Sequence, residues 1–223
     1  MSHFEQELAD LKETLLRMAA LAKGVVNKSV KSLIERDDVL AQEVKDEDNA
    51  IDELEILVDE KAVQLLSKAP LANDLRLITV ALKTSHDLER VGDESTTIAR
   101  RAMELNKEPQ LKEYVDIPRM TMMAMEMLDD ALDAFVNADA AKAKAIVPRD
   151  KEVDALNKQM HRELAGYMIE DPKNITRSLH LMTVSKSVER IADHAKNIAE
   201  EVVFLYEGRD IRHAANLGSA NEI

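Results

Sequence analysis

Apolar residues recur along this chain with the spacing of α-helices, and prolines and short polar stretches separate the helical segments. The repeat is clearest between residues 38 and 68, where every seventh position is apolar: Val44, Ile51, Val58 and Leu65. Residues seven apart share one face of a helix, so this segment presents an apolar stripe to neighbouring helices. The whole pattern predicts six helices, over residues 4–36, 38–68, 72–106, 116–138, 140–170 and 173–206, followed by a polar tail.

Pro148 is the one residue that conflicts with this division, because it falls inside the segment 140–170. Proline has no backbone N–H and its ring clashes with the preceding turn, so we expect a kink at this position. The alternative is that a helix begins at Pro148, since proline is tolerated in the first turn. The kink is the favoured interpretation.

The composition favours an all-α fold. The 223 residues include 5 Gly and 5 Pro, and aromatic residues make up 3% of the chain. So few turn-forming and aromatic residues leave little material for a β-sheet, and the expected core consists of Leu, Ile, Val, Met and Ala. We expect more than about 70% helix and no sheet, whereas an average domain contains roughly 30–35% helix.

The second half of the chain repeats the first half. Residues 88–93 align with residues 188–193 at a shift of 100. Earlier in each half the shift is 102, and it aligns the following residues: Asp37 with Asp139, Asp48 with Asp150, Asp52 with Asp154 and Pro70 with Pro172. Helices one to three therefore correspond in order to helices four to six.

An internal duplication of this kind predicts two tandem three-helix bundles. About 100 residues are enough for three antiparallel helices to enclose a core. The expected domains are residues 1–108 and 109–208, with a C-terminal tail over residues 209–223.

The net charge of −13 and the absence of cysteine exclude several classes of function. Nucleic acids and anionic lipids both require a basic surface, so neither is an expected partner. Without cysteine there are no disulfides, thiolate metal sites or catalytic thiols. The sequence shows no apolar run long enough to span a membrane and no signal peptide at its beginning. The acidic charge permits binding of cations or of basic partner surfaces.

Pairs of acidic residues one helical turn apart are the candidate chemistry, and they occur at matching places in both halves. The residues are Asp48, Asp52, Glu89 and Asp93 in the first half and Asp150, Asp154, Glu189 and Asp193 in the second. If the second helix packs beside the third, four carboxylates meet on the outside of each bundle. Their mutual repulsion is relieved by a cation, and oxygen ligands suit Mg, Mn or Fe.

The alternative is that these pairs are solvated helix faces. Acids make up 43 of the 223 residues, so about eight pairs at i, i+4 are expected by chance. Other pairs do occur, such as Glu55 with Asp59, and we treat these as background. Only the recurrence in both halves raises the four chosen pairs above that background.

Other residue groups carry weaker indications. Arg90 and Arg190 follow the key glutamate in each half and are expected to pair with neighbouring acids. His194, beside Asp193, is a possible ligand, but the first half has Glu94 in its place. The methionines at 120, 122, 123, 125 and 127 indicate core or interface packing. The Glu-x-x-His pattern of di-iron bundles and the glycine motifs of nucleotide sites are absent.

The sequence resembles the PhoU family over nearly its whole length. Three segments carry the resemblance: Asp-Leu-Arg at 74–76, Leu-Glu-Arg-Val-Gly-Asp at 88–93 and Val-Glu-Arg-Ile-Ala-Asp at 188–193. The beginning of the first helix, His3 to Leu11, and the late segment Gly208 to His213 are similar as well. One departure is Ala192, which stands where the first half has Gly92 and suggests a slightly wider approach of the helices there.

The resemblance implies a fold of two three-helix bundles and a non-enzymatic, cytoplasmic regulator that is often dimeric. Members are thought to connect the ATPase subunit of the phosphate ABC transporter to a sensor histidine kinase at the inner membrane. They thereby damp phosphate-starvation signalling when phosphate is plentiful. The alternatives are a carboxylate-bridged metalloenzyme and a purely structural helical scaffold.

Metal clusters on the acidic motif are a second implication of the resemblance. The metal would be Fe, Mn, Mg or Zn. Carried over position by position, the ligands in the first bundle are Asp48, Asp52, Glu89 and Asp93. Those in the second bundle are Asp150, Asp154, Glu189 and Asp193.

Overall fold

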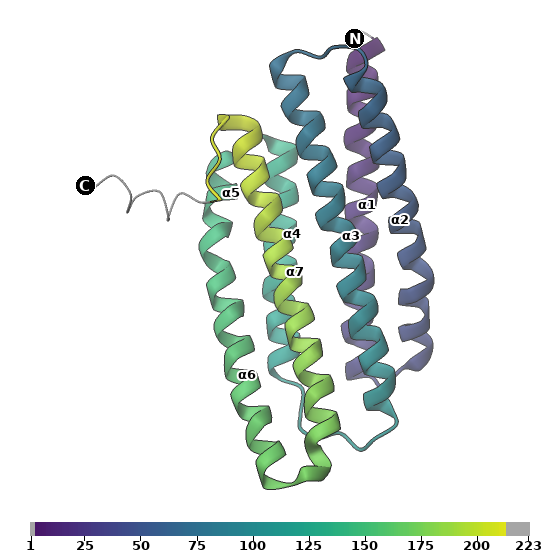
Figure 1. Cartoon of the computed structure of the whole chain (residues 1–223), viewed down its shortest axis with the longest axis vertical. Coiled ribbons are helices and arrows are strands. Elements are labelled where there is room, and N and C mark those ends of the chain that lie inside the picture. Colours follow the sequence, from purple (N-terminus) through teal and green to yellow (C-terminus); the bar gives the residue numbers. More distant parts are fainter. Residues whose placement is uncertain (1–2, 213–223) are drawn as a thin grey trace, which may run out of the picture.

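The computed structural model describes residues 3–212 as an all-helical protein, with no strand in that range (Figure 1). Helices account for 88% of it, as the sequence predicted. Residues 1–2 and 213–223, which include most of the expected tail, lie outside the described range. The α-helices are α1 (His3–Ile34), α2 (Asp38–Leu66), α3 (Ala72–Asn106), α4 (Asp116–Asn137), α5 (Ala140–Ile146), α6 (Asp150–Glu170) and α7 (Ile175–Glu207).

Matching caps start the second helix of each half. Asp37 accepts hydrogen bonds from two backbone N–H groups in the first turn of α2, and Asp139 accepts one from the first turn of α5. Such caps satisfy N–H groups that have no partner inside a helix. Before each cap the chain turns through a left-handed residue, Arg36 with φ 56° and Ala138 with φ 57°. The duplication therefore extends to the local backbone.

Pro148 interrupts the helix expected over 140–170. α5 ends at Ile146, a 3₁₀ turn covers Val147–Arg149, and α6 begins at Asp150. The backbone stays right-handed through this turn, since Val147 has φ −51° and ψ −43°. The result is closer to the expected kink than to a new helix beginning at the proline. Another short 3₁₀ turn, Pro172–Asn174, precedes α7, so the last α-helix begins slightly later than predicted.

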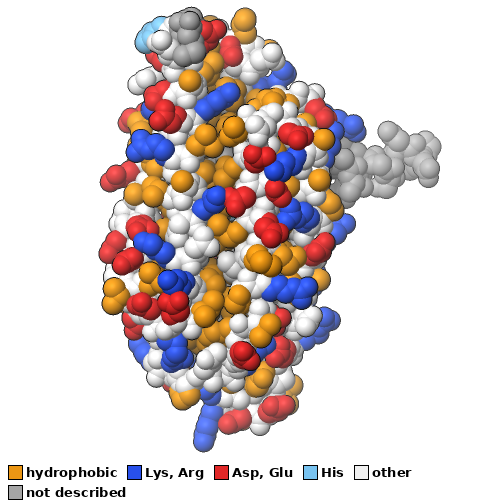
Figure 2. All heavy atoms as spheres, turned by 180° about the vertical axis from the view of Figure 1, so that it is seen from behind, with side chains coloured by type: hydrophobic (Ala, Val, Ile, Leu, Met, Phe, Trp, Pro, Cys, Tyr) orange, Lys and Arg blue, Asp and Glu red, His pale blue; other side chains and the backbone are white. Residues whose placement is uncertain are grey.

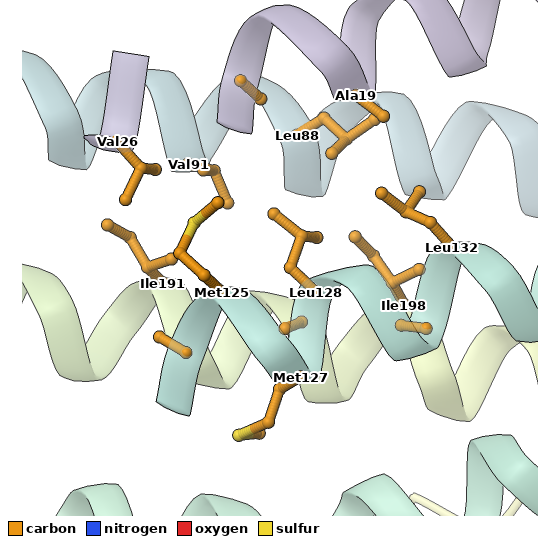
Figure 3. Close-up of a cluster of buried hydrophobic side chains, with 14 of the residues drawn as sticks. Ala19, Val26, Leu88, Val91, Met125, Met127, Leu128, Leu132, Ile191 and Ile198 are labelled. Carbon is orange, nitrogen blue, oxygen red and sulfur yellow. The ribbon is translucent and has the colours of Figure 1, made fainter. Parts of the chain in front are cut away.

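The two bundles share one hydrophobic core. The predicted stripe of α2 is buried, and buried residues from all seven α-helices form a single cluster. α3 packs on α7 as extensively as any helix pair within a bundle, and α1 also touches α4. Figure 3 shows where they meet, with Leu88 and Val91 of α3 close to Leu128 of α4 and Ile191 of α7. The long helices of both halves therefore pack side by side.

An exposed groove runs between the bundles on the side of α1 and α4. Figure 2, which looks at this side, shows hydrophobic side chains along the middle of the face. Exposed members of this row are Leu16 and Ile34 of α1 and Met122 and Val136 of α4. Met120 and Met127 are buried, so the methionine run serves the core as well as this groove.

Candidate metal centre

α2 and α3 bring the four acids of the first half together. We call Asp48, Asp52, Glu89 and Asp93 the first acid cluster. The negative charges of Asp52 and Asp93 both act on Asp48, and that of Asp93 acts on Glu89. The structure therefore brings these carboxylates near one another across α2 and α3, but among the described residues no three of them offer ligand atoms that all lie within 4.8 Å of one another.

The acids are less exposed than the sequence suggested. The side chain of Glu89 is 15% exposed, whereas that of Asp93, one turn later, is 46% exposed. The second half shows the same division, with 12% for Glu189 and 50% for Asp193. The glutamate of each pair lies in the crevice between helices and the aspartate lies at its rim.

Gly92 allows Asp48 to lie against the backbone of α3. A Cβ atom at residue 92 would be 2.4 Å from Asp48 Oδ1 and 3.2 Å from Ile51 Cδ1. Asp48 Oδ1 and Glu89 Oε2 are buried and accept no hydrogen bond from any described residue, although Arg90 Nε lies 3.2 Å from Glu89 Oε2. Buried acceptors without donors are costly, and a bound cation would satisfy them. Asp48 Oδ1 and Glu89 Oε2 are therefore each suited to contact a cation.

Burial and crowding make both carboxyls hard to ionise. Burial, together with the charges of Asp52 and Asp93, raises the pKa of Asp48 to about 6. Burial and the charge of Asp93 raise the pKa of Glu89 to about 7, despite the opposing effect of Arg90. A carboxyl shifts upward in this way when its negative charge is poorly compensated.

Glu55 and His86 border the first acid cluster, and the sequence analysis missed both. Together with Glu89 they offer one ligand atom each, all within 4.8 Å of one another. His86 Nδ1 lies 3.3 Å from Glu55 Oε1. The sequence analysis treated Glu55 with Asp59 as background, whereas the structure places Glu55 beside Glu89, one turn after Asp52 along α2. His86 could have been recognised from the sequence, because it lies one turn before the key glutamate, Glu89.

The second half gathers its acids around lysines. We call Asp150, Asp154, Glu189 and Asp193 the second acid cluster. Lys196 Nζ lies 3.1 Å from Asp150 Oδ2 and 2.9 Å from Asp193 Oδ1, so it joins α6 to α7. Burial and the neighbouring Asp154 raise the pKa of Glu189, but Lys186 pairs with its carboxylate and opposes that shift.

The remaining candidates have structural partners. Arg90 Nη1 donates to Asp93 Oδ2 at 2.8 Å, and Arg190 Nη1 donates to Glu94 Oε1 of the other bundle at 2.9 Å. Both arginines therefore pair with neighbouring acids, as expected. His194 does not face the second acid cluster, since its Nδ1 lies 2.8 Å from Asp87 Oδ1 at the contact between α3 and α7.

Comparison with known proteins identifies the relatives of this chain. The family model of the PhoU domain matches twice, at residues 15–102 and 117–202. A protein of Pseudomonas aeruginosa named phosphate-specific transport system accessory protein PhoU homolog is 42% identical over 94% of this chain and 88% of its own length. A protein of the same name from Aquifex aeolicus is 40% identical over 93% of this chain and 95% of its own length.

Solved structures agree with these matches. The crystal structure of PhoU from Pseudomonas aeruginosa superposes with a TM-score of 0.90 at 42% identity, covering 93% of this chain and 100% of that one. The phosphate transport system regulatory protein PhoU from Streptococcus pneumoniae gives a TM-score of 0.87 at 29% identity, covering 94% and 99%. The duplicated acidic motif, the paired bundles and these relatives agree, and the chain belongs to the PhoU family.

Proposed function

We propose that this protein regulates phosphate uptake and phosphate-starvation signalling as a non-enzymatic adaptor. Its partners would be the ATPase subunit of the phosphate ABC transporter and a sensor histidine kinase. The observation that carries the proposal is the match over nearly the full length to relatives named as accessory proteins of phosphate-specific transport. Two bundles of long helices packed side by side offer two extended faces, which suits contact with two partners at once. The chain would act in the cytoplasm, as a homodimer, and reach the inner membrane through its partners.

The membrane contact itself would come from the partners. Within residues 3–212, no helix has both the length and the apolar character needed to cross a bilayer. In cells that make the transporter and the sensor, we expect a share of the protein to sediment with membranes. Deleting both partners should release it, which is measured by fractionation and immunoblotting at native expression. Sedimentation that persists without either partner would contradict the adaptor role and indicate direct lipid binding.

We further propose that the first acid cluster binds a metal ion, with Glu55 and His86 as additional ligands. Carboxylate oxygens together with one imidazole suit Mn, Fe or Zn better than Mg, which prefers oxygen alone. The buried oxygens of Asp48 and Glu89, neither of which accepts a hydrogen bond from a described residue, support this proposal. Metal analysis of the protein purified at native level, with its partners attached, tests ligand and partner in one sample.

Gly92→Ala should weaken metal binding at the first acid cluster by at least roughly tenfold, about 1.4 kcal/mol. The added Cβ would overlap Asp48 Oδ1, so the carboxylate must move away from the backbone of α3. In the metal-free protein the gain of about 1 kcal/mol in helix propensity opposes the cost of that movement. Calorimetric titration with Mn²⁺ measures the affinity.

Gly24→Ala is the matched control for this variant. Gly24 lies inside α1, and a Cβ there would meet nothing within 4 Å. It should raise stability by about 0.5–1 kcal/mol and leave the affinity for Mn²⁺ unchanged. Equal affinities of the two glycine variants would contradict the close approach of Asp48 as a requirement for binding.

A further inference from the structure

The two acid clusters are related by the duplication, but one position distinguishes them. Lys196 lies between a carboxylate of α6 and one of α7, within hydrogen-bond distance of Asp150 and Asp193. The corresponding residue of the first half is Thr96, whose hydroxyl donates to the backbone oxygen of Asp93 at 2.8 Å. The second cluster therefore contains an ammonium group between its helices, where the first cluster has a short neutral side chain.

A second position removes the close approach that the first cluster depends on. Asp48 Oδ1 lies only 2.4 Å from where a Cβ would stand on Gly92. The corresponding residue, Ala192, is buried and carries that Cβ. Asp150 is therefore excluded from the equivalent place. It lies instead at the first residue of α6, directly after the turn that contains Pro148, and contacts Lys196.

Further lysines complete the compensation of charge in the second cluster. Lys186 pairs with Glu189, and the corresponding residue of the first half is His86. Lys158 Nζ lies 3.6 Å from Asp154 Oδ2. Each of the four acids in the second cluster thus has a lysine partner. In the first cluster Asp48 enters no ion pair with any residue of the described range.

We propose that Lys196 is a built-in counter-ion that takes the place of a metal in the second acid cluster. Each chain then binds metal through its first bundle, and the second bundle keeps its charge balance without metal. This inference rests on the proposed metal binding of the first cluster. If Lys196 has this role, the adaptor has two related faces. The charge of the first face changes when metal is bound or lost, and the charge of the second face stays the same.

Reciprocal exchange of the two residues tests the proposal. Lys196→Thr combined with Ala192→Gly, which removes the Cβ beside the cluster as well as the ammonium, should create a metal site in the second bundle, so that the protein binds more Mn²⁺ per chain than wild type. Thr96→Lys should abolish binding of Mn²⁺ by the first bundle, because its ammonium reaches the carboxylates. Glu89→Gln with Asp93→Asn, in a chain that keeps Lys196, should leave the protein without bound Mn²⁺. Bound Mn²⁺ that persists in that double variant, and disappears on Asp193→Asn, would overturn the proposal.

Thermal melting in excess chelator separates the counter-ion from the metal. Lys196→Met keeps most of the side-chain volume but removes the charge, so it should lower the melting temperature, and Lys196→Arg should restore it. Equal melting temperatures of wild type and Lys196→Met would overturn the role of Lys196. Wild-type protein that takes up no Mn²⁺ at either cluster would refute the proposed metal function, whereas these chelated melting curves would still decide whether Lys196 is a counter-ion.

Discussion

Glu89→Gln with Asp93→Asn should remove metal from the first acid cluster and with it most of the stabilisation that metal provides. A ligand that binds only the folded state adds about 2.7 kcal/mol at a concentration of one hundred times Kd. For a protein of this size that corresponds to a shift of roughly 5–10 °C in melting temperature. Thermal melting with and without Mn²⁺, together with metal analysis of each sample, measures both effects.

Without metal, Glu89→Gln alone should melt at a higher temperature than wild type above pH 8. In wild type the carboxylate of Glu89 is partly buried beside Asp93, and burial raises its pKa to about 7. Ionisation of Glu89 therefore costs stability in the folded state. The neutral amide removes that cost and preserves the volume. Asp93→Asn should raise the melting temperature by less, because it also removes the surface ion pair of Asp93 with Arg90. Such pairs contribute about 0–1 kcal/mol to stability.

Glu60→Gln is the control for this series. Glu60 is an exposed carboxyl of α2 outside the first acid cluster. Its substitution should change neither the metal content nor the shift in melting temperature caused by Mn²⁺. If the cluster variant and Glu60→Gln show the same metal content and the same shift, the cluster carboxylates are a solvated helix face.

The helices could be predicted from the sequence because their boundaries depend on local chemistry. Helix-breaking residues near Pro70 and Pro109 separate the helical segments. The heptad spacing of α2 identifies the face of that helix that is buried. Asp37 and Asp139 align in the repeat and cap equivalent helices. The effect of Pro148 was harder to predict, because proline removes a backbone hydrogen bond both when a helix kinks and when a 3₁₀ turn interrupts it.

The composition of the acid cluster could be predicted only in part, because it depends on the register between two helices. Spacing along α3 places Glu89 and Asp93 on one face, but it does not determine which turn of α2 lies opposite. That register brings in Glu55 and His86 and leaves Asp52 exposed. The burial of Glu89 likewise follows from how closely the helices approach.

The difference between the two halves was present in the sequence and became meaningful only with the structure. Aligning the repeat places Thr96 on Lys196 and Gly92 on Ala192. On an isolated helix a lysine three residues after an aspartate is an ordinary surface pair. It becomes an inter-helix counter-ion because α6 places Asp150 on its other side.

Metal should reverse the pH dependence of stability. In the folded, metal-free protein, burial raises the pKa of Asp48 to about 6 and that of Glu89 to about 7, whereas unfolded carboxyls titrate near 4. Between these values the folded state retains protons that the unfolded state has lost. The stability contributed by these groups is therefore complete below about pH 4 and is lost as the pH rises through about 6 to 7.

The variant Asp48→Asn with Glu89→Gln isolates this effect from the rest of the chain. In excess chelator, the stability of wild type relative to this variant should fall between pH 5 and pH 8. In Mn²⁺ it should rise over the same range, because the metal competes with protons for the same oxygens and binds more tightly as they dissociate. Denaturant unfolding at four pH values, with and without Mn²⁺, gives both slopes. A flat difference in chelator would show that neither carboxyl is destabilised by folding. Slopes of the same sign in both conditions would show that the ion binds elsewhere.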